Sequence, residues 1–213
     1  MKKEFLPPKT KRRLCRQTGQ IQWMPGIFLT LFLIVLCSAK LKELQFGTTA
    51  LYMEDALAAS NLASALIDVK EYGQSHTVKI ADPERSYQVY LKALGENLNL
   101  DENGLCANQE LIAGGVTVDL YMIYNVEGGE VTFLQVDQQG CHDRGKGRLG
   151  EVYAPDGSLI EHTSIYSQIS FEVKGFGEST YTARKGKLVD IVGESPPENE
   201  TEDEKRINVN DEG

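Results

Sequence analysis

The segment from residue 140 to 147, GCHDRGKG, comes closest to a nucleotide-binding motif. Gly140 is followed, after four residues, by Gly145 and Lys146, as in a P-loop. Gly147, however, stands where that motif needs Ser or Thr to hold a magnesium ion. A P-loop also joins a strand to a helix, whereas this segment is expected between two strands. We therefore expect a mobile glycine-rich loop and no phosphate site.

The same segment contains the residue types of a cysteine hydrolase. Cys141, His142 and Asp143 could act as nucleophile, base and orienting acid. Neighbours in sequence rarely point at one another, and such triads are built from separated segments. We therefore expect no catalytic role for these residues.

The remaining titratable residues do not form a recognisable site. His76 and His162 stand alone, and Glu54, Asp55 and Asp68 lack the second cluster that paired-carboxylate catalysis needs. The cysteines have neither a CxxC nor a zinc-type spacing. We expect a protein that is not an enzyme, with no cofactor, no metal ion and no identified small-molecule substrate.

The charge of the chain is unevenly distributed. The net charge is -9, yet residues 1 to 25 contain seven basic residues and one acidic residue, while the last twenty contain eight acidic and two basic. Nucleic-acid binding needs a Lys/Arg footprint, which the acidic middle of the chain lacks. We therefore expect no nucleic-acid partner.

An uncharged run from Ile21 to Ala39 follows the basic residues. Nineteen helical residues at about 1.5 Å each cover roughly the 30 Å hydrocarbon core of a bilayer. The preceding Lys and Arg residues favour a cytoplasmic N-terminus. We expect a single transmembrane helix. Its anchoring residues are Trp23, Ile27, Phe28, Leu31, Phe32, Ile34 and Val35.

Two other interpretations of this run stay open. The most apolar part is short enough for a cleaved signal peptide, and the residues Cys37-Ser38-Ala39 are small, as signal peptidase prefers. A lipoprotein signal is less well supported, because Leu36 precedes Cys37 where a small residue is expected. Anchor and signal peptide alike place residues 40 to 213 outside the cytoplasm.

The topology separates the four cysteines. Cys15 would be cytoplasmic and Cys37 within the membrane, whereas Cys106 and Cys141 would be exported, where thiols can oxidise. We expect a disulfide between Cys106 and Cys141; two unpaired cysteines are the alternative.

Residues 40 to 72 are expected to continue the helix outside the membrane. They contain no proline, and their leucines recur at helical intervals. The segment EDALAASNLASALID, residues 54 to 68, is rich in alanine and serine, and small residues let helices approach closely. The expected packing residues are Ala50, Ala58, Ala59, Ser60 and Ala63.

The rest of the chain predicts an α+β domain with an antiparallel sheet. Asp82 and Pro83 begin a helix, and Gly128-Gly129 forms a tight turn between two strands. We expect one side of the first long strand to carry Val116, Val118, Leu120, Met122, Tyr124 and Val126. The expected organisation is a basic cytoplasmic stub (1–20), a transmembrane helix (21–39), an extracytoplasmic helix (40–72), an α+β domain (73–193) and a disordered acidic tail (194–213).

This organisation resembles that of type IV pilin-like proteins. The segments ALYMEDALAASNLASALIDVKEYG and IADPERSYQVYLKALGENLNLD are similar to the minor-pilin-like proteins of bacterial tight-adherence (Tad/Flp-type) pili. The resemblance implies a lollipop-shaped subunit that assembles through its N-terminal helix with other pilin-like subunits. Gly26 precedes Ile27 as at a prepilin cleavage site, but the fifth position after it is Leu31 instead of the usual glutamate. We therefore expect an accessory subunit.

Two functions follow as expectations. The first is a non-enzymatic, membrane-anchored surface protein that is a component or assembly factor of a Tad/type IV-like pilus. The second is an exported ligand-binding or sensor module for which the apolar run is a signal peptide or a simple tether.

Overall fold

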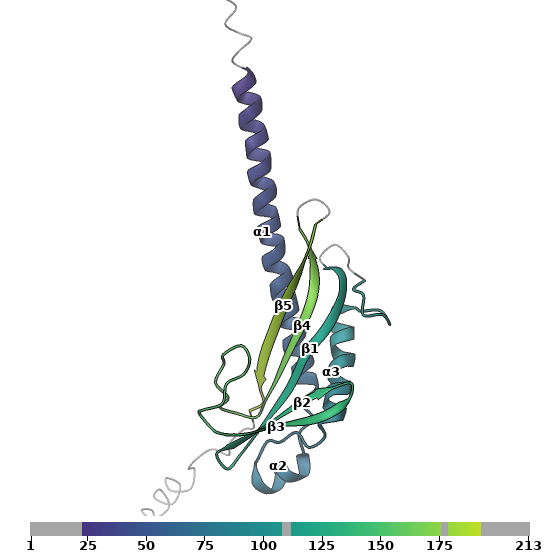
Figure 1. Cartoon of the computed structure of the whole chain (residues 1–213), viewed down its shortest axis with the longest axis vertical. Helices are drawn as coiled ribbons and strands as arrows, with labels where there is room; N and C mark the ends of the chain where they lie inside the picture. Colours follow the sequence, from purple (N-terminus) through teal and green to yellow (C-terminus); the bar gives the residue numbers. More distant parts are fainter. Residues whose placement is uncertain (1–22, 108–111, 176–178, 193–213) are drawn as a thin grey trace, which may run out of the picture. The chain divides into compact units, whose positions relative to one another are not determined.

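The computed structural model describes residues 23–107, 112–175 and 179–192 and shows an α+β fold (Figure 1). The expected cytoplasmic stub (1–20) and the expected acidic tail (194–213) lie outside these residues. The chain divides into two compact units, Met1–Leu44 and Gln45–Gly213. We call the second the C-terminal unit.

Helix α1 runs from Trp23 to Ala63. Its first part is the apolar run, which is long and apolar enough to cross a membrane and is not buried by any other part of the described chain. All seven expected anchoring residues are between 49% and 66% exposed.

Helix α1 ends earlier than Tyr72, where the sequence suggested its end. The main chain turns after Ala63, and Asp68 begins the short helix α2, Val69–Ser75. The Asp68 carboxylate accepts hydrogen bonds from the main-chain amides of Lys70 and Glu71, at 3.0 and 3.1 Å, as an N-cap does. A local capping signal at Asp68 thus starts a new helix.

Helix α3, Pro83–Leu98, forms as its sequence predicts. Asp82 is the N-cap and accepts a hydrogen bond from the amide of Arg85, and Pro83 occupies the first turn. Asn99 ends the helix in a left-handed conformation, with φ 49°. The buried face of α3 consists of Ser86, Tyr87, Tyr90, Leu94 and Leu98.

Five antiparallel strands form one sheet in the order β3-β2-β1-β4-β5. The strands are β1 Ile112–Glu127, β2 Glu130–Asp137, β3 Gly140–Arg148, β4 Ser164–Lys174 and β5 Thr180–Asp190. Gly128 and Gly129 both have positive φ, 58° and 85°, and form the expected two-residue turn between β1 and β2.

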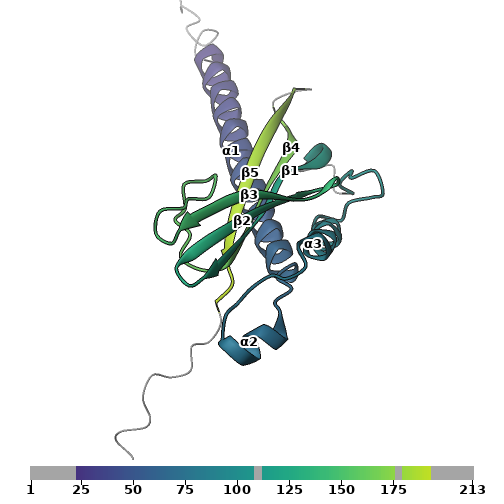
Figure 2. The same ribbon diagram turned by 60° about the horizontal axis from the view of Figure 1, so that its bottom comes forward.

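Each face of the sheet has its own hydrophobic cluster. On one face, the part of α1 within the C-terminal unit and α3 pack on β1, β2 and β4 through residues such as Leu57, Leu94, Ile123 and Ile165 (Figure 2). On the other, the connection from β3 to β4 contributes Ala154 and Ile160, which pack with Tyr124 and Tyr166.

The prediction that six apolar residues of β1 share one side of the strand is wrong. Val118 pairs with Ile169 and Leu120 pairs with Gln168, so Asp119 is an extra residue in the ladder. Such a bulge reverses the alternation of side chains beyond it. Val116 and Val118 therefore pack on the helix side, whereas Leu120, Met122, Tyr124 and Val126 pack against the β3–β4 connection.

Two local predictions are also corrected. Residues 140–147, expected as a mobile loop, belong to the edge strand β3, which pairs with β2 along its length. The sequence HTVKIA, residues 76–81, also predicts a strand, but it forms no named strand: only its Ile80 makes an isolated bridge, to Ile67. His76 instead caps α2 in a left-handed conformation.

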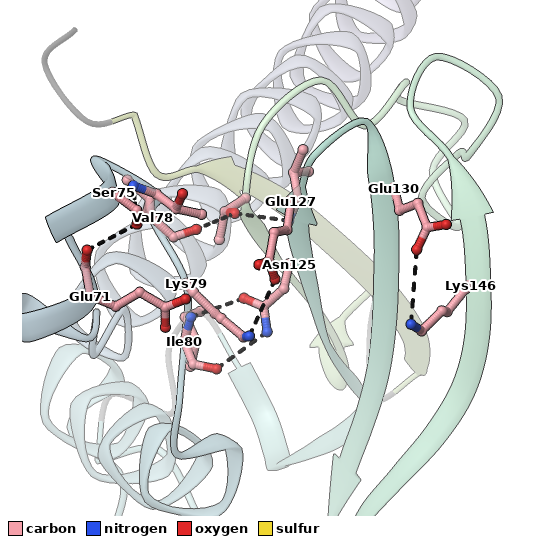
Figure 3. Close-up of polar contacts among 12 residues, drawn as sticks. Glu71, Ser75, Val78, Lys79, Ile80, Asn125, Glu127, Glu130 and Lys146 are labelled. Carbon is pink, nitrogen blue, oxygen red and sulfur yellow. Dashed lines mark hydrogen bonds and ion pairs between the residues drawn. The ribbon is translucent and has the colours of Figure 1, made fainter.

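The Asn125 side chain replaces a strand partner for the segment before α3 (Figure 3). Its amide accepts a hydrogen bond from the amide of Ile80 at 2.9 Å and donates one to the carbonyl of Ile80 at 3.2 Å. Nearby, Lys79 pairs with Glu127 at 3.3 Å. These contacts hold the connection between α2 and α3 on the end of β1.

Candidate functional site

The main candidate site is an apolar cavity of about 480 Å³ between α1 and the strands β4 and β5, of which β5 is the edge strand. We call it the α1–β5 cavity. Its lining residues are Phe46, Thr49, Ala50, Phe171, Val173, Tyr181 and Ala183. The Thr49 hydroxyl is already used, because it donates to the carbonyl of Gln45 within α1. The cavity therefore suits an apolar occupant, in the size range of small-molecule sites.

No pattern in the sequence indicates this cavity. Ile169, Phe171 and Val173 alternate with polar residues in the sequence, and they lie on the helix side of β4. Ala183 and Tyr181 pair with Phe171 and Val173, so β5 extends the same apolar surface. Only the pairing of β4 with β5, and the approach of α1, brings the lining residues together.

A charged cluster borders the cavity. Glu54 of α1 accepts hydrogen bonds from Lys187 at 2.7 Å and pairs with Lys185 at 2.8 Å, and both lysines lie on β5. Hydrogen bonds from Lys185 and then Lys187 lower the pKa of Glu54 to about 2. The cluster contains two positive charges and one negative charge, so it is net positive.

The C-terminal part of α1 has two different faces. The inner face packs on the sheet and contains Thr49, Met53, Ala56, Leu57, Ser60 and Asn61, all of them buried. The opposite face, which we call the outer face, includes Leu51, Asp55, Ala59, Leu62 and Ala63, all of them exposed. Leu51 and Leu62 are 64% and 61% exposed, although both are large and apolar.

The expected packing residues do not share one face. Ala59 and Ala63 are exposed, Ala58 is half-buried and Ala50 lines the cavity. Ser60 is fully buried, and its hydroxyl donates to the carbonyl of Ala56 at 2.6 Å. Part of the alanine and serine content of α1 therefore serves its close packing on its own sheet.

A buried hydroxyl network fixes the end of α1. Ser86 of α3 donates to the carbonyl of Ser64 at 2.6 Å, and its oxygen lies 2.7 Å from that of Tyr121 on β1. The Tyr121 hydroxyl in turn donates to the Ser64 hydroxyl at 2.8 Å. Burial raises the pKa of Tyr121 to about 12, so the group stays protonated and acts as a donor.

The expected disulfide between Cys106 and Cys141 is wrong, because both thiols are free. Cys106 is buried and donates to the carbonyl of Leu98, at the C-terminal end of α3. Cys141 lies beside Glu84, in the first turn of α3. Burial is the main cause of the raised pKa of Cys141, and the negative charge of Glu84 raises that pKa further. Fourteen helical residues separate Leu98 from Glu84, roughly 20 Å, whereas a disulfide needs Cα atoms within about 7 Å.

The Cys141-His142-Asp143 segment does not form a triad. Successive side chains of β3 alternate between the two faces of the sheet. His142 lies 3.3 Å from Asp137, on β2, and not against Asp143, which accepts from the amide of Gly145. Within the described ranges, no group of three or more His, Cys, Asp or Glu residues could hold a metal ion.

Comparisons with known proteins do not assign a family. The sequence matches no family model, no curated protein and no solved structure. The features of the chain that bear on function are therefore α1 and the α1–β5 cavity.

Proposed function

We propose that this chain is a non-enzymatic, membrane-anchored pilin-like surface protein, a component or an assembly factor of a Tad/type IV-like pilus. The N-terminus lies in the cytoplasm and the C-terminal unit lies outside, because basic residues precede the apolar run. Ala58 is half-buried beside the outer face, and its side chain is as small as those of Ala59 and Ala63 on that face.

The outer face of α1 is the observation that carries this proposal. A helix on the surface of a soluble domain normally has polar residues on the face that is exposed to water. Here Leu51 and Leu62 are largely exposed, with Ala59 and Ala63 among them. Large apolar side chains interleaved with small ones suit close contact with another helix. The partner that fits is the equivalent helix of another pilin-like subunit.

Cysteine crosslinking in native membranes tests this function. Cys15, Cys37 and Cys141 are first replaced by serine, while Cys106 is kept because it is buried. Ala59→Cys then places a thiol on the outer face, and Ala56→Cys is the matched control on the inner face, where the residue is 5% exposed.

We expect oxidation to join Ala59→Cys chains to a neighbouring helix carrying the same substitution, and to leave Ala56→Cys chains uncrosslinked. A protein that stays monomeric at its native expression level, with no crosslink at Ala59, would contradict the assembly role. Equal crosslinking at both positions would show that the outer face is not the contact surface.

A second function, an exported ligand-binding or sensor module, is favoured by the α1–β5 cavity. On this proposal the apolar run is a signal peptide or a tether, and the cavity is the ligand site. Cleavage after Ala39, with release of a folded soluble C-terminal unit, would favour this function over the pilin-like one.

A further inference from the structure

We propose that the α1–β5 cavity holds the alkyl chain of an anionic membrane lipid, with the lipid head beside Lys185 and Lys187. This inference needs the membrane anchor but not the pilus. Its failure therefore leaves the assembly role untouched.

The cavity has the composition and size of an alkyl-chain site. Aromatic and aliphatic side chains from α1, β4 and β5 surround it, including Phe46, Phe171 and Val173. Its volume of about 480 Å³ is roughly three times that of an engineered apolar cavity of about 150 Å³ that binds benzene. An apolar chain would remove these side chains from water.

The charged cluster gives the site a polar end. Glu54 follows Ala50 by one turn of α1, about 6 Å along the helix. Lys185 follows Ala183 on the same side of β5, about 7 Å along the strand. Because Glu54 neutralises only one of the two lysines, one positive charge remains beside the apolar lining. This combination of an apolar cavity and a net positive rim matches an anionic amphiphile.

The sequence places the cavity close to a source of lipid. Phe46 follows Lys40, the residue after the uncharged run, by six positions of the same helix, α1. Six residues reach at most about 22 Å, even when fully extended. If the apolar run is a membrane anchor, Phe46 is therefore tethered within that reach of the end of the run.

Photocrosslinking with a defined probe tests this proposal. The full-length chain is reconstituted in phosphatidylcholine nanodiscs with a fatty acid that carries a diazirine in the middle of its chain. After irradiation, the labelled residues are identified by mass spectrometry of proteolytic peptides. Labelling of residues 23–39 is expected from the bilayer in any case, so the readout is labelling of peptides that contain Phe46–Ala50 or Tyr181–Ala183.

Ala183→Trp and Ala50→Trp each fill the cavity, from the strand and from the helix. Ala81→Trp, at an exposed position just before α3 and away from both the cavity and the outer face, is the control. We expect each cavity variant to lower the labelling of the lining peptides at least about tenfold and the control to change it less than about twofold. Protection of the Cys106 thiol from alkylation shows that each variant is folded, because Cys106 is buried. Using two filling variants guards against the failure of one to fold.

A second arm tests the polar end. Lys185→Gln removes the excess positive charge, so labelling by the fatty acid should fall several-fold, while labelling by its uncharged methyl ester should not change. Shorter competitors should be weaker by roughly fourfold per methylene removed, for as long as the chain is buried.

Three results would overturn the proposal: labelling confined to residues 23–39, lining labels that persist in both Trp variants, or equal sensitivity of acid and ester to Lys185→Gln. If the Trp variants instead lower crosslinking between chains without changing lipid labelling, the occupant is a second copy of this chain and the proposal is wrong.

Discussion

Replacing Leu57 and Leu62 by alanine, one at a time, tests the two-faced structure of α1. The two leucines have the same side chain and lie five residues apart on one helix, but Leu57 is 0% exposed and Leu62 is 61% exposed. Any difference between the variants therefore reports the environment of the side chain and not the helix propensity of the substitution.

The expected magnitudes differ clearly. Leu57 packs in the cluster that α1 and α3 form on the sheet, and removing a fully buried leucine side chain costs about 2–5 kcal/mol of unfolding free energy. For a domain of about 150–250 residues, each 1 kcal/mol shifts the melting temperature by about 2–4 °C, so Leu57→Ala should lower it by roughly 4–20 °C. Leu62→Ala should change the unfolding free energy by less than about 0.5 kcal/mol.

Thermal unfolding of the full-length chain in one neutral detergent, followed by near-ultraviolet circular dichroism, provides the assay. The tyrosines of the core, including Tyr90 and Tyr121, report the packing of the C-terminal unit. Equal losses of stability for the two variants, or a larger loss for Leu62→Ala, would refute the assignment of inner and outer faces.

Three further predictions concern the rest of the C-terminal unit. Asn125→Ala removes both hydrogen bonds to Ile80 and should cost about 1–3 kcal/mol of unfolding free energy, measured by the same assay. An unchanged melting temperature would show that these two hydrogen bonds do not stabilise the fold. Gly186→Ala should cost about 1–3 kcal/mol, because a Cβ there collides with the Tyr166 hydroxyl, and adding Tyr166→Phe should restore part of that loss; a loss that persists in full would point to another cause. Without reductant, alkylation of the native protein should modify Cys141 and spare Cys106. Because burial and then Glu84 raise the pKa of Cys141, its reaction should be slow near neutral pH and should accelerate as the pH rises; a thiol that appears only after reduction would show a disulfide.

Features with local signals could be predicted from the sequence. The apolar run needs only length and the absence of charge, α3 has a capping residue and a proline at its start, and the β1–β2 turn has two glycines. Each signal lies within a few residues of the feature that it specifies, so no knowledge of tertiary contacts was needed.

Features that depend on strand pairing could not be predicted in the same way. The bulge at Asp119 inserts one residue opposite β4, and no pattern in β1 alone shows where the ladder shifts. The disulfide was expected because only two cysteines lie in the part of the chain that should be exported. The two cysteines in fact lie near opposite ends of α3. The α1–β5 cavity likewise combines segments that are more than 120 residues apart.

The small residues of α1 could be predicted only in part. The alanine and serine content of α1 indicates close packing, but it does not show which surface each residue packs against. The structure buries Ala56 and Ser60 against the sheet of the same chain and leaves Ala59 and Ala63 exposed. The angular position of each residue relative to the sheet decides between these environments, and that position follows from the docking of α1.

In the proposed function, the mature protein keeps α1 whole, with its apolar part in the membrane and its outer face against other subunits. The intact mass of the native protein, measured on chains isolated from membrane complexes, tests this claim most directly. We expect a mass that includes residues 27–39, and we expect the chains to be recovered in assemblies larger than a monomer. A mature chain that begins at Lys40 and is recovered as a soluble monomer would contradict it.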